Sequence, residues 1–276
     1  MIFELRDKAY SCGRPAVMAV LNVTPDSFSD GGRYQHLDAA LRHAEQLIIQ
    51  GTDILDVGGE STRPGSRQVG IQEELDRVIP VLEALYLRFS VSLSIDTSRT
   101  EVMREAVSQG AELINDVNAL QAAGAVELVA KTGVAVCLMH KKGQPDTMQL
   151  APAYRNVTVE VKDFLRCRLE ATRTAGIDKR KILLDPGFGF GKTLDHNLQL
   201  LRELASFDEL GCPILVGLSR KSMLGAITGR AVEDRLVGSA ALALLAVQNG
   251  AAVVRVHDVA ATQDVLAIWR AVRDGE

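Results

Sequence analysis

Residues 17–22 read VMAVLN, an apolar run that stops abruptly at an asparagine. The run is rich in aliphatic residues and shows no in-out alternation, which is typical of a β-strand covered on both faces. Similar runs recur along the chain, and each is followed by a longer segment. They occupy residues 54–57, 92–96, 113–116, 134–140, 182–185, 214–219 and 253–257. The sequence therefore predicts eight buried strands.

The segments between the runs have the periodicity of amphipathic helices. Residues 37–50 place their apolar side chains on one face and stop before Gly51, and residues 232–249 stop before Gly250. A glycine just past a periodic segment is a common helix terminator. The same one-sided pattern is found at residues 72–89 and 193–205. Strand-helix units in strict alternation predict the α/β class, as a single (β/α)₈ TIM barrel.

The domain organisation follows from the same alternation. No linker, low-complexity tract or shift in composition interrupts the 276 residues, so we expect one domain over residues 1–276. Residues 1–15 precede the first run and predict a cap or a short hairpin. Alternation alone does not prove that the sheet closes, so an open doubly wound sheet is the alternative.

Composition excludes several classes of protein. The net charge is −4 and the 31 basic residues are spread along the chain, which argues against a nucleic-acid-binding surface. The four cysteines are far apart, which argues against a zinc site and a disulfide scaffold. No apolar stretch reaches the ~18 residues of a membrane span, and the N-terminus lacks the apolar core of a signal peptide. We expect a cytoplasmic protein.

Polar residues stand where the apolar runs stop. The C-terminal ends of all barrel strands lie on one face, where active sites of this fold are found. A single polar residue there could be a helix cap, but Arg255 and His257 are poor caps, and so many together favour a site. The set comprises Asn22, Asp56, Asp96, Asn115, His140, Asp185, residues 219–221 and residues 255–257.

Two long loops extend this predicted ring. LNVTPDSFSDGG at 21–32 and GGESTRPG at 58–65 are too rich in Gly and Pro for helices and longer than ordinary connections. They are either disordered surface or lids that exclude water after a substrate binds. Phe28 and Arg63 favour lids, because a solvated loop gains nothing from a Phe. We therefore expect long loops 1 and 2 at the C-terminal face.

The stretch DPGFGFGKT at 185–193 superficially matches a phosphate-binding loop. Only three residues separate Gly187 from the Gly-Lys pair, whereas that loop needs four, so an NTPase is rejected. Glycines interleaved with Phe instead indicate a backbone that approaches a ligand closely, with Phe190 available to stack on it.

The side chains of the ring suit two kinds of ligand group. Asp96, Asn115 and Asp185 can accept hydrogen bonds from a flat heterocycle with several N–H donors. The cations Arg63, Lys221, Arg255 and His257 suit a phosphate or diphosphate. The set predicts a nitrogen-rich substrate with a phosphorylated leaving group. A Schiff base on Lys221 stays open, and a Ser-His-Asp triad would lack its nucleophile elbow.

Seven motifs resemble those of the dihydropteroate synthase family. They are LNVTPDSFSDGG, DVGGESTRPG, IDTS, LINDV, LLDPGFGFGKT, GLSRKSMLG and VRVHDV, in the order expected between Asn22 and Asp258. The resemblance implies a TIM-barrel transferase of folate biosynthesis and a target of sulfonamides. Such enzymes join 6-hydroxymethyl-7,8-dihydropterin diphosphate to p-aminobenzoate and release diphosphate, here by a dissociative, SN1-like substitution.

The resemblance also implies a role for individual residues. Catalysis would depend on Asp96, Lys221 and Arg63. The pterin would be held by Asp96, Asn115, Asp185, Lys221 and Arg255. The diphosphate would be held by Thr62, Arg63, Ser219, Arg255 and His257. The p-aminobenzoate pocket would be lined by Phe28, Thr62, Pro64, Phe190, Lys221 and Ser222. The cofactor would be Mg²⁺, with Asn22 as its protein ligand.

Some expectations concern assembly and alternatives. Members of the family are usually homodimers built on the last helices, and VGSAALALLAV at 237–247 is apolar enough to bury more than one face. A pterin-binding methyltransferase barrel and a non-catalytic pterin-binding paralogue are the alternative functions. The chain departs from the family pattern at residues 140–143, HKKG, and at Arg99-Thr100, where Lys-Pro is common.

Overall fold

A computed structural model of the chain describes residues 1–5, 8–23, 33–60, 69–143 and 147–275, with residues 33–35 described as backbone only. Its centre is a closed barrel in the strand order β10-β3-β4-β5-β6-β7-β8-β9. Every neighbouring pair in it is parallel. The predicted (β/α)₈ barrel is confirmed, and the open doubly wound sheet is excluded.

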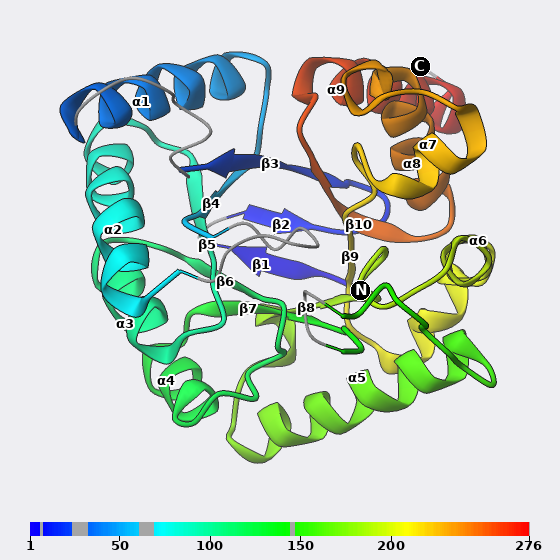
Figure 1. Cartoon of the computed structure of the whole chain (residues 1–276), viewed down its shortest axis with the longest axis horizontal. Coiled ribbons are helices and arrows are strands. Elements are labelled where there is room, and N and C mark those ends of the chain that lie inside the picture. Colours follow the sequence, from blue (N-terminus) through cyan, green and yellow to red (C-terminus); the bar gives the residue numbers. More distant parts are fainter. Residues whose placement is uncertain (6–7, 24–32, 61–68, 144–146, 276) are drawn as a thin grey trace.

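Helices form an outer ring that follows the chain order around the barrel (Figure 1). The strands are β3 (Ala16–Asn22), β4 (Ile54–Gly58), β5 (Ser92–Asp96), β6 (Leu113–Asp116), β7 (Ala135–Met139), β8 (Ile182–Asp185), β9 (Ile214–Val216) and β10 (Ala251–Val256). The helices are α1 (Arg33–Ile49), α2 (Ile71–Arg88), α3 (Thr100–Ser108), α4 (Ala125–Thr132), α5 (Val157–Thr174), α6 (Leu194–Arg202), α7 (Ser222–Thr228), α8 (Leu236–Gln248) and α9 (Val259–Asp274).

Several element boundaries differ from the expectation, and three of the differences occur at a turn or a 3₁₀ helix. β9 ends at Val216, because the chain beyond it turns, with Arg220 in the left-handed region at φ 59°. The helix expected over 193–205 ends at Arg202 and is followed by a 3₁₀ helix, Leu204–Leu210. The helix expected over 232–249 begins as the 3₁₀ turn Val232–Asp234 before α8.

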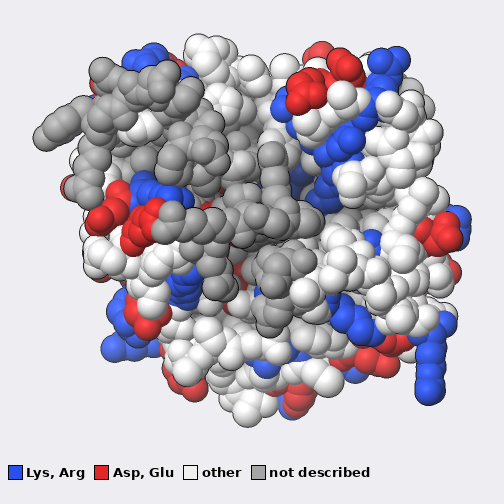
Figure 2. Space-filling model, in the orientation of Figure 1, with Lys and Arg blue, Asp and Glu red and all other residues white. Residues whose placement is uncertain are grey.

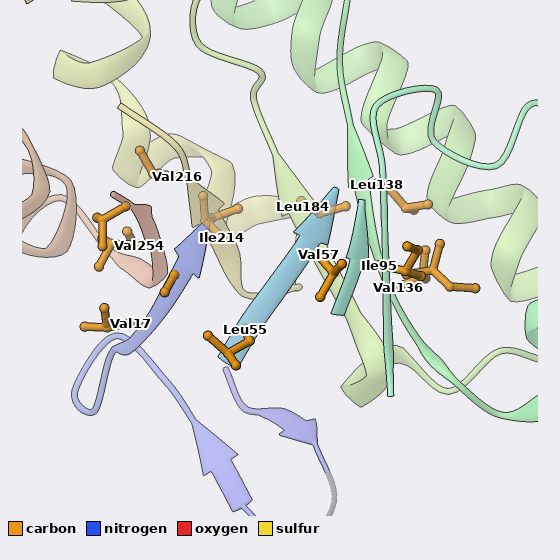
Figure 3. Close-up of a cluster of buried hydrophobic side chains, with 14 of the residues drawn as sticks. Val17, Leu55, Val57, Ile95, Val136, Leu138, Leu184, Ile214, Val216 and Val254 are labelled. Carbon is orange, nitrogen blue, oxygen red and sulfur yellow. The ribbon is translucent and has the colours of Figure 1, made fainter. Parts of the chain in front are cut away.

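The outward face of each strand packs against the helices. Val17, Leu55, Ile95, Leu184 and Val254 belong to this layer, which is part of the largest buried apolar cluster (Figure 3). Successive strand residues point to opposite faces, so the intervening residues fill the barrel interior. The sequence shows no alternation because both faces of each strand are buried.

The barrel interior is apolar at the N-terminal end of the strands. Met18, Ile54, Leu113 and Cys137 form a separate buried cluster there. The hairpin of β1 (Phe3–Leu5) and β2 (Lys8–Tyr10) is antiparallel and adds Phe3, Leu5 and Tyr10 to this cluster. The hairpin predicted for residues 1–15 is confirmed, and it covers this end of the barrel.

The surface carries charges of both signs. On the face shown in Figure 2, basic side chains stand among acidic ones, with one short row of basic side chains at the upper right. Among the residues that the structure describes, no helix is both long enough and apolar enough to span a membrane.

Candidate active site

The inward residues change from apolar to polar toward the C-terminal ends of the strands. The parallel register places Asn22 beside Gly58, Gly58 beside Asp96, and Asp96 beside Asn115. Four strands that are distant in sequence therefore contribute to one level of the barrel. The predicted convergence of strand ends is observed at this level.

Arg255 of β10 links two carboxylates across the barrel mouth. Its Nε donates to Asp56 Oδ2 at 2.6 Å, and its Nη2 donates to Asp96 Oδ2 at 2.7 Å. Burial opposes the charge of Arg255, but the two carboxylates outweigh it and raise the pKa of the guanidinium. Charge-assisted bonds of this kind hold the three side chains in fixed positions.

Asp56 is a residue of the ring that was assigned no role from the sequence. Its side chain is fully buried and also accepts hydrogen bonds from Ser94 Oγ at 2.6 Å and from Asn115 Nδ2 at 2.9 Å. Because Asn115 uses its amide nitrogen on Asp56, its Oδ1 remains an acceptor. Asp56 therefore orients Arg255 and Asn115 together. Its position two residues before Gly58 places it on the inward face of the strand, and this was the feature of the sequence that could have identified it as a site residue.

Asp96 is the most strongly perturbed carboxyl of the ring. Burial raises its pKa to about 7, with Arg255 opposing and Asp56 reinforcing the shift. Perturbed carboxyls of this kind are typical of functional sites. Near neutral pH, Asp96 can therefore exist in either protonation state before a ligand binds.

Asp185 and Lys221 form the opposite side of the ring. Asp185 Oδ1 accepts from Gly187 N at 2.7 Å, and burial raises the pKa of this carboxyl while Lys221 opposes the shift. Burial lowers the pKa of Lys221 to about 8, with Asp185 opposing. Lys221 Nζ donates to Phe188 O and lies 4.7 Å from the centroid of the Phe190 ring. An aromatic surface thus adjoins the charged ring.

Ser219 and His257 are held against one another beside this ring. His257 N donates to Ser219 Oγ at 3.2 Å, and His257 Nδ1 lies 3.1 Å from the same oxygen. Arg220, between Ser219 and Lys221, forms an ion pair of 2.5 Å with Asp258 that fixes this turn. Ser222 follows as the first residue of α7 and is exposed. These predicted site residues lie together.

Asn22 lies where a metal could be bound by oxygen ligands. A Cβ on Gly58 would be 3.5 Å from Asn22 Oδ1 and 3.8 Å from Asp96 Oδ2, so both oxygens flank the glycine. In the described part of the chain, no group of three His, Cys, Asp or Glu side chains could hold a metal. Mg²⁺ often takes only one or two protein oxygens and completes its shell with phosphate and water. The residues present fit such an ion.

One predicted residue faces away from the observed ring, and four others lie outside the residues that the structure describes. His140 is buried and faces Lys192 rather than the ring, with Nδ1 and Nζ 3.0 Å apart. The assigned residues of the two long loops lie outside the residues that the structure describes, so their roles remain predictions. They are Phe28, Thr62, Arg63 and Pro64.

Arg99, where the family pattern has lysine, connects the two ends of segment 61–68. It donates to Val69 O, and its guanidinium lies 3.2 Å from Glu60 and 2.6 Å from the buried carboxylate of Glu74. Val69 N also donates to Glu60 at 3.3 Å. The departure from the family pattern therefore lies at the base of the second loop and outside the ring.

Comparison with known proteins identifies the family. The pterin-binding enzyme family matches residues 18–257. The dihydropteroate synthase of Haemophilus influenzae is 50% identical over 265 residues, with 96% of each chain covered. A Yersinia pestis dihydropteroate synthase solved in a sulfonamide drug complex has a TM-score of 0.93 at 49% identity, covering 99% of this chain and 100% of that one.

Structures of the Xanthomonas albilineans dihydropteroate synthase give the same result. The one with 4-aminobenzoic acid has a TM-score of 0.92 at 50% identity, and the one with 7,8-dihydropteroate has 0.89 at 48%. They cover 99% of this chain and 98% and 99% of theirs. The chain thus has relatives along nearly its whole length, and it belongs to the dihydropteroate synthase family of pterin-binding enzymes.

Proposed function

We propose that this chain joins 6-hydroxymethyl-7,8-dihydropterin diphosphate to p-aminobenzoate, as a transferase of folate biosynthesis that works in the cytoplasm. The observation that carries the proposal is the network in which Arg255 bridges Asp56 and Asp96 while Asp56 holds the amide of Asn115. It presents fixed acceptors at the site where the family binds a pterin.

The pterin is recognised by the deep acceptors of the ring. The carboxylates of Asp96 and Asp185 and the Oδ1 of Asn115 can accept from the N–H groups of an amino-pyrimidinone edge. Lys221 donates to an acceptor of the same ring system. All four side chains are held by neighbours before the ligand arrives, which lowers the entropic cost of binding.

The departing diphosphate is the difficult part of the reaction, because the aryl amine is a weak nucleophile. Ser219 and His257 lie on the side of the ring where donors can contact it, and Arg63 and Thr62 are predicted to complete this set. Asn22 would hold Mg²⁺, which when bound offsets the charge on the departing oxygens.

The bond to the leaving group is proposed to break before the new bond forms. The methylene left behind carries positive charge that is shared with the pterin ring. A carboxylate already fixed at the site stabilises such charge without reorganisation, and Asp96 is the ring carboxylate that lies beside Asn22 across Gly58. The substitution is therefore SN1-like, with Asp96 opposite the developing cation.

The second substrate is proposed to lie on the aromatic side of the site. Phe190 lies next to Lys221 on this side. Ser222, which follows Lys221 at the start of α7, and Phe28, Thr62 and Pro64 are predicted to complete the region. The Xanthomonas relative was solved with 4-aminobenzoic acid and the Yersinia relative with a sulfonamide, which supports the same pocket here. We propose that sulfonamides compete for it.

Product formation tests the assignment directly. Purified protein with the pterin diphosphate, p-aminobenzoate and Mg²⁺ should yield 7,8-dihydropteroate and one diphosphate per turnover, measured by chromatography. Chelation of the metal should abolish turnover, and a sulfonamide should inhibit competitively with p-aminobenzoate. Pterin binding without any condensation would favour the non-catalytic paralogue, and methyl transfer from a folate would favour a methyltransferase barrel.

The pH dependence of kcat/KM should be bell-shaped, because it reports the ionisation of the free enzyme. Activity should rise as Asp96 loses its proton near pH 7 and fall as Lys221 loses its proton near pH 8. Steady-state rates between about pH 5.5 and about pH 9.5 would cover both limbs. Asp96→Asn should remove the acid limb, and an unchanged acid limb in that variant would contradict the assignment.

We also propose a homodimer that covers the outer face of α8 and α9. These helices pack against one another and both carry exposed apolar side chains, Val237 and Leu245 on α8 and Ile268 and Val272 on α9. α8 is apolar nearly all round, so one covered face does not satisfy it.

Light scattering after size exclusion should therefore give twice the mass of the single chain. Val237→Glu should shift the protein to the mass of one chain at micromolar concentration, because burying the carboxylate in an apolar interface is costly. Val159→Glu places the same charge on α5, where Val159 is 48% exposed, and should leave the mass unchanged. A wild-type protein of single-chain mass would refute the dimer.

A further inference from the structure

Lys192 lies inside the protein, directly behind the turn that follows β8. Its side chain is 3% exposed, and its Nζ contacts Gly187 O at 2.8 Å, Phe190 O at 3.2 Å and His140 Nδ1 at 3.0 Å. This is the lysine of the GKT sequence that superficially matches a phosphate loop. Its ammonium faces inward, onto backbone carbonyls, and is not available to a phosphate.

The surroundings of Lys192 match the donors of an ammonium group. A lysine has three N–H donors, and the three closest acceptors supply one partner for each. Burial lowers the pKa of His140 to about 3, so the imidazole is neutral and Nδ1 can accept. Burial also lowers the pKa of Lys192 well below its ordinary value, while Asp185 opposes the shift. A buried amine of this kind requires all of its partners.

The turn fixed by Lys192 has no room for side chains at its glycines. Gly187 and Gly191 both have positive φ, and a Cβ on either would overlap a carbonyl oxygen, of His140 and Lys142 respectively. The backbone of 187–191 therefore lies directly on residues 140–142. On its other side, Gly189 N donates to Asn197 Oδ1 at 2.7 Å.

This turn presents two groups to the active site. The carbonyl of Phe188 accepts from Lys221 Nζ, and the ring of Phe190 lies 4.7 Å from the same nitrogen. Lys192 bonds the carbonyls on either side of these groups, at Gly187 and Phe190. Lys192 therefore contacts the same turn as Lys221, the side chain proposed to contact substrate.

We propose that Lys192 is a positioning residue for the reaction, which holds the turn 187–190 so that Phe190 and Lys221 form the wall of the p-aminobenzoate pocket. The inference rests on the proposed function. It assigns no contact with substrate to Lys192 itself. Of the four pterin-binding side chains, Asp96 and Asn115 come from other strands and do not depend on this turn. Asp185 and Lys221 contact it, through Gly187 N and Phe188 O.

The test compares Lys192→Met with wild-type protein and with Lys162→Met, a control that removes an ion-paired lysine of 14% exposure on the outer helix α5. Lys192→Met should raise the KM for p-aminobenzoate about tenfold, while the Kd of the pterin diphosphate, from calorimetry, rises by a smaller factor because Asp96 and Asn115 are unaffected. Hydrogen exchange of the 186–193 amides, measured without substrate by mass spectrometry, should increase in this variant only.

Each outcome decides the question. Unchanged KM and unchanged exchange in Lys192→Met would overturn the proposal, and so would a parallel loss of pterin and p-aminobenzoate affinity together with a lower Tm. If that variant does not fold, Lys192→Gln is measured in the same way, and failure of both to fold would make Lys192 a folding residue only. A wild-type protein that makes no dihydropteroate would reject the proposed function, while the exchange data would still report on the turn.

Discussion

Replacing Asp96 by asparagine should slow product formation about 10²–10³-fold, the loss typical when one preorganised electrostatic group is removed from an active site. The amide keeps the volume of the carboxyl and can still hydrogen-bond the pterin, but it carries no charge to stabilise a cationic methylene. The Kd of the pterin diphosphate should rise by about tenfold, as for one lost charge-assisted hydrogen bond. Single-turnover kinetics and calorimetry would separate the two effects.

Asp56→Asn is the matched comparison, because it removes one negative charge from the same network. Asp56 accepts hydrogen bonds from Ser94, Asn115 and Arg255. Its loss should disturb the orientation of Arg255 and Asn115, and so affect pterin binding more than the chemical step. Equal effects of the two variants on kcat would mean that net charge matters rather than its position, and near-normal turnover in Asp96→Asn would sink the SN1-like mechanism.

The strands were predictable because of where their polarity changes. Residues 92–96, 113–116 and 182–185 were expected as strands and are observed with the same bounds. In each case the apolar run ends at a polar residue at the barrel mouth, and this change in polarity shows where the strand ends. In the run 214–219 no polar residue shows where β9 ends, because Gly217 and Leu218 continue the run after the last paired residue, Val216.

The contacts between loops were not predictable in the same way. His140 ends an apolar run like the other ring residues, yet its side chain faces Lys192 because the chain folds back over it at Gly187. Which of two inward polar residues touches a ligand and which supports its neighbour also depends on depth along the strand. Asp56 is the inward-facing residue before Gly58 on β4 and therefore lies deeper in the barrel. There it accepts hydrogen bonds from Arg255 and Asn115 and holds both in place.

Replacing Arg255 by methionine should destabilise the protein by about 3–5 kcal/mol, the cost of leaving a buried charge without its partner. Asp56 is fully buried and the Asp96 side chain is 12% exposed, so neither carboxylate can recover its hydration. The cost should fall at low pH. Burial raises the pKa of Asp96 to about 7 even with Arg255 opposing, and loss of Arg255 removes that opposition. The folded-state pKa of Asp96 therefore lies above its unfolded value, so stability is retained below the unfolded pKa and lost as pH rises through the folded value.

Urea unfolding at pH 5 and pH 8, a span of about 3 units, should therefore show a larger deficit at the higher pH. Arg273→Met is the matched control, since Arg273 pairs with Asp274 at 2.6 Å on the surface, where both side chains are more than a third exposed. Ion pairs between exposed side chains contribute little to stability because water screens them, so this variant should unfold like wild type at both pH values. A deficit in Arg255→Met that is small, or equal at the two pH values, would show that Asp96 is already neutral in the folded protein, and Arg255 could not then be the cation that keeps it ionised for catalysis.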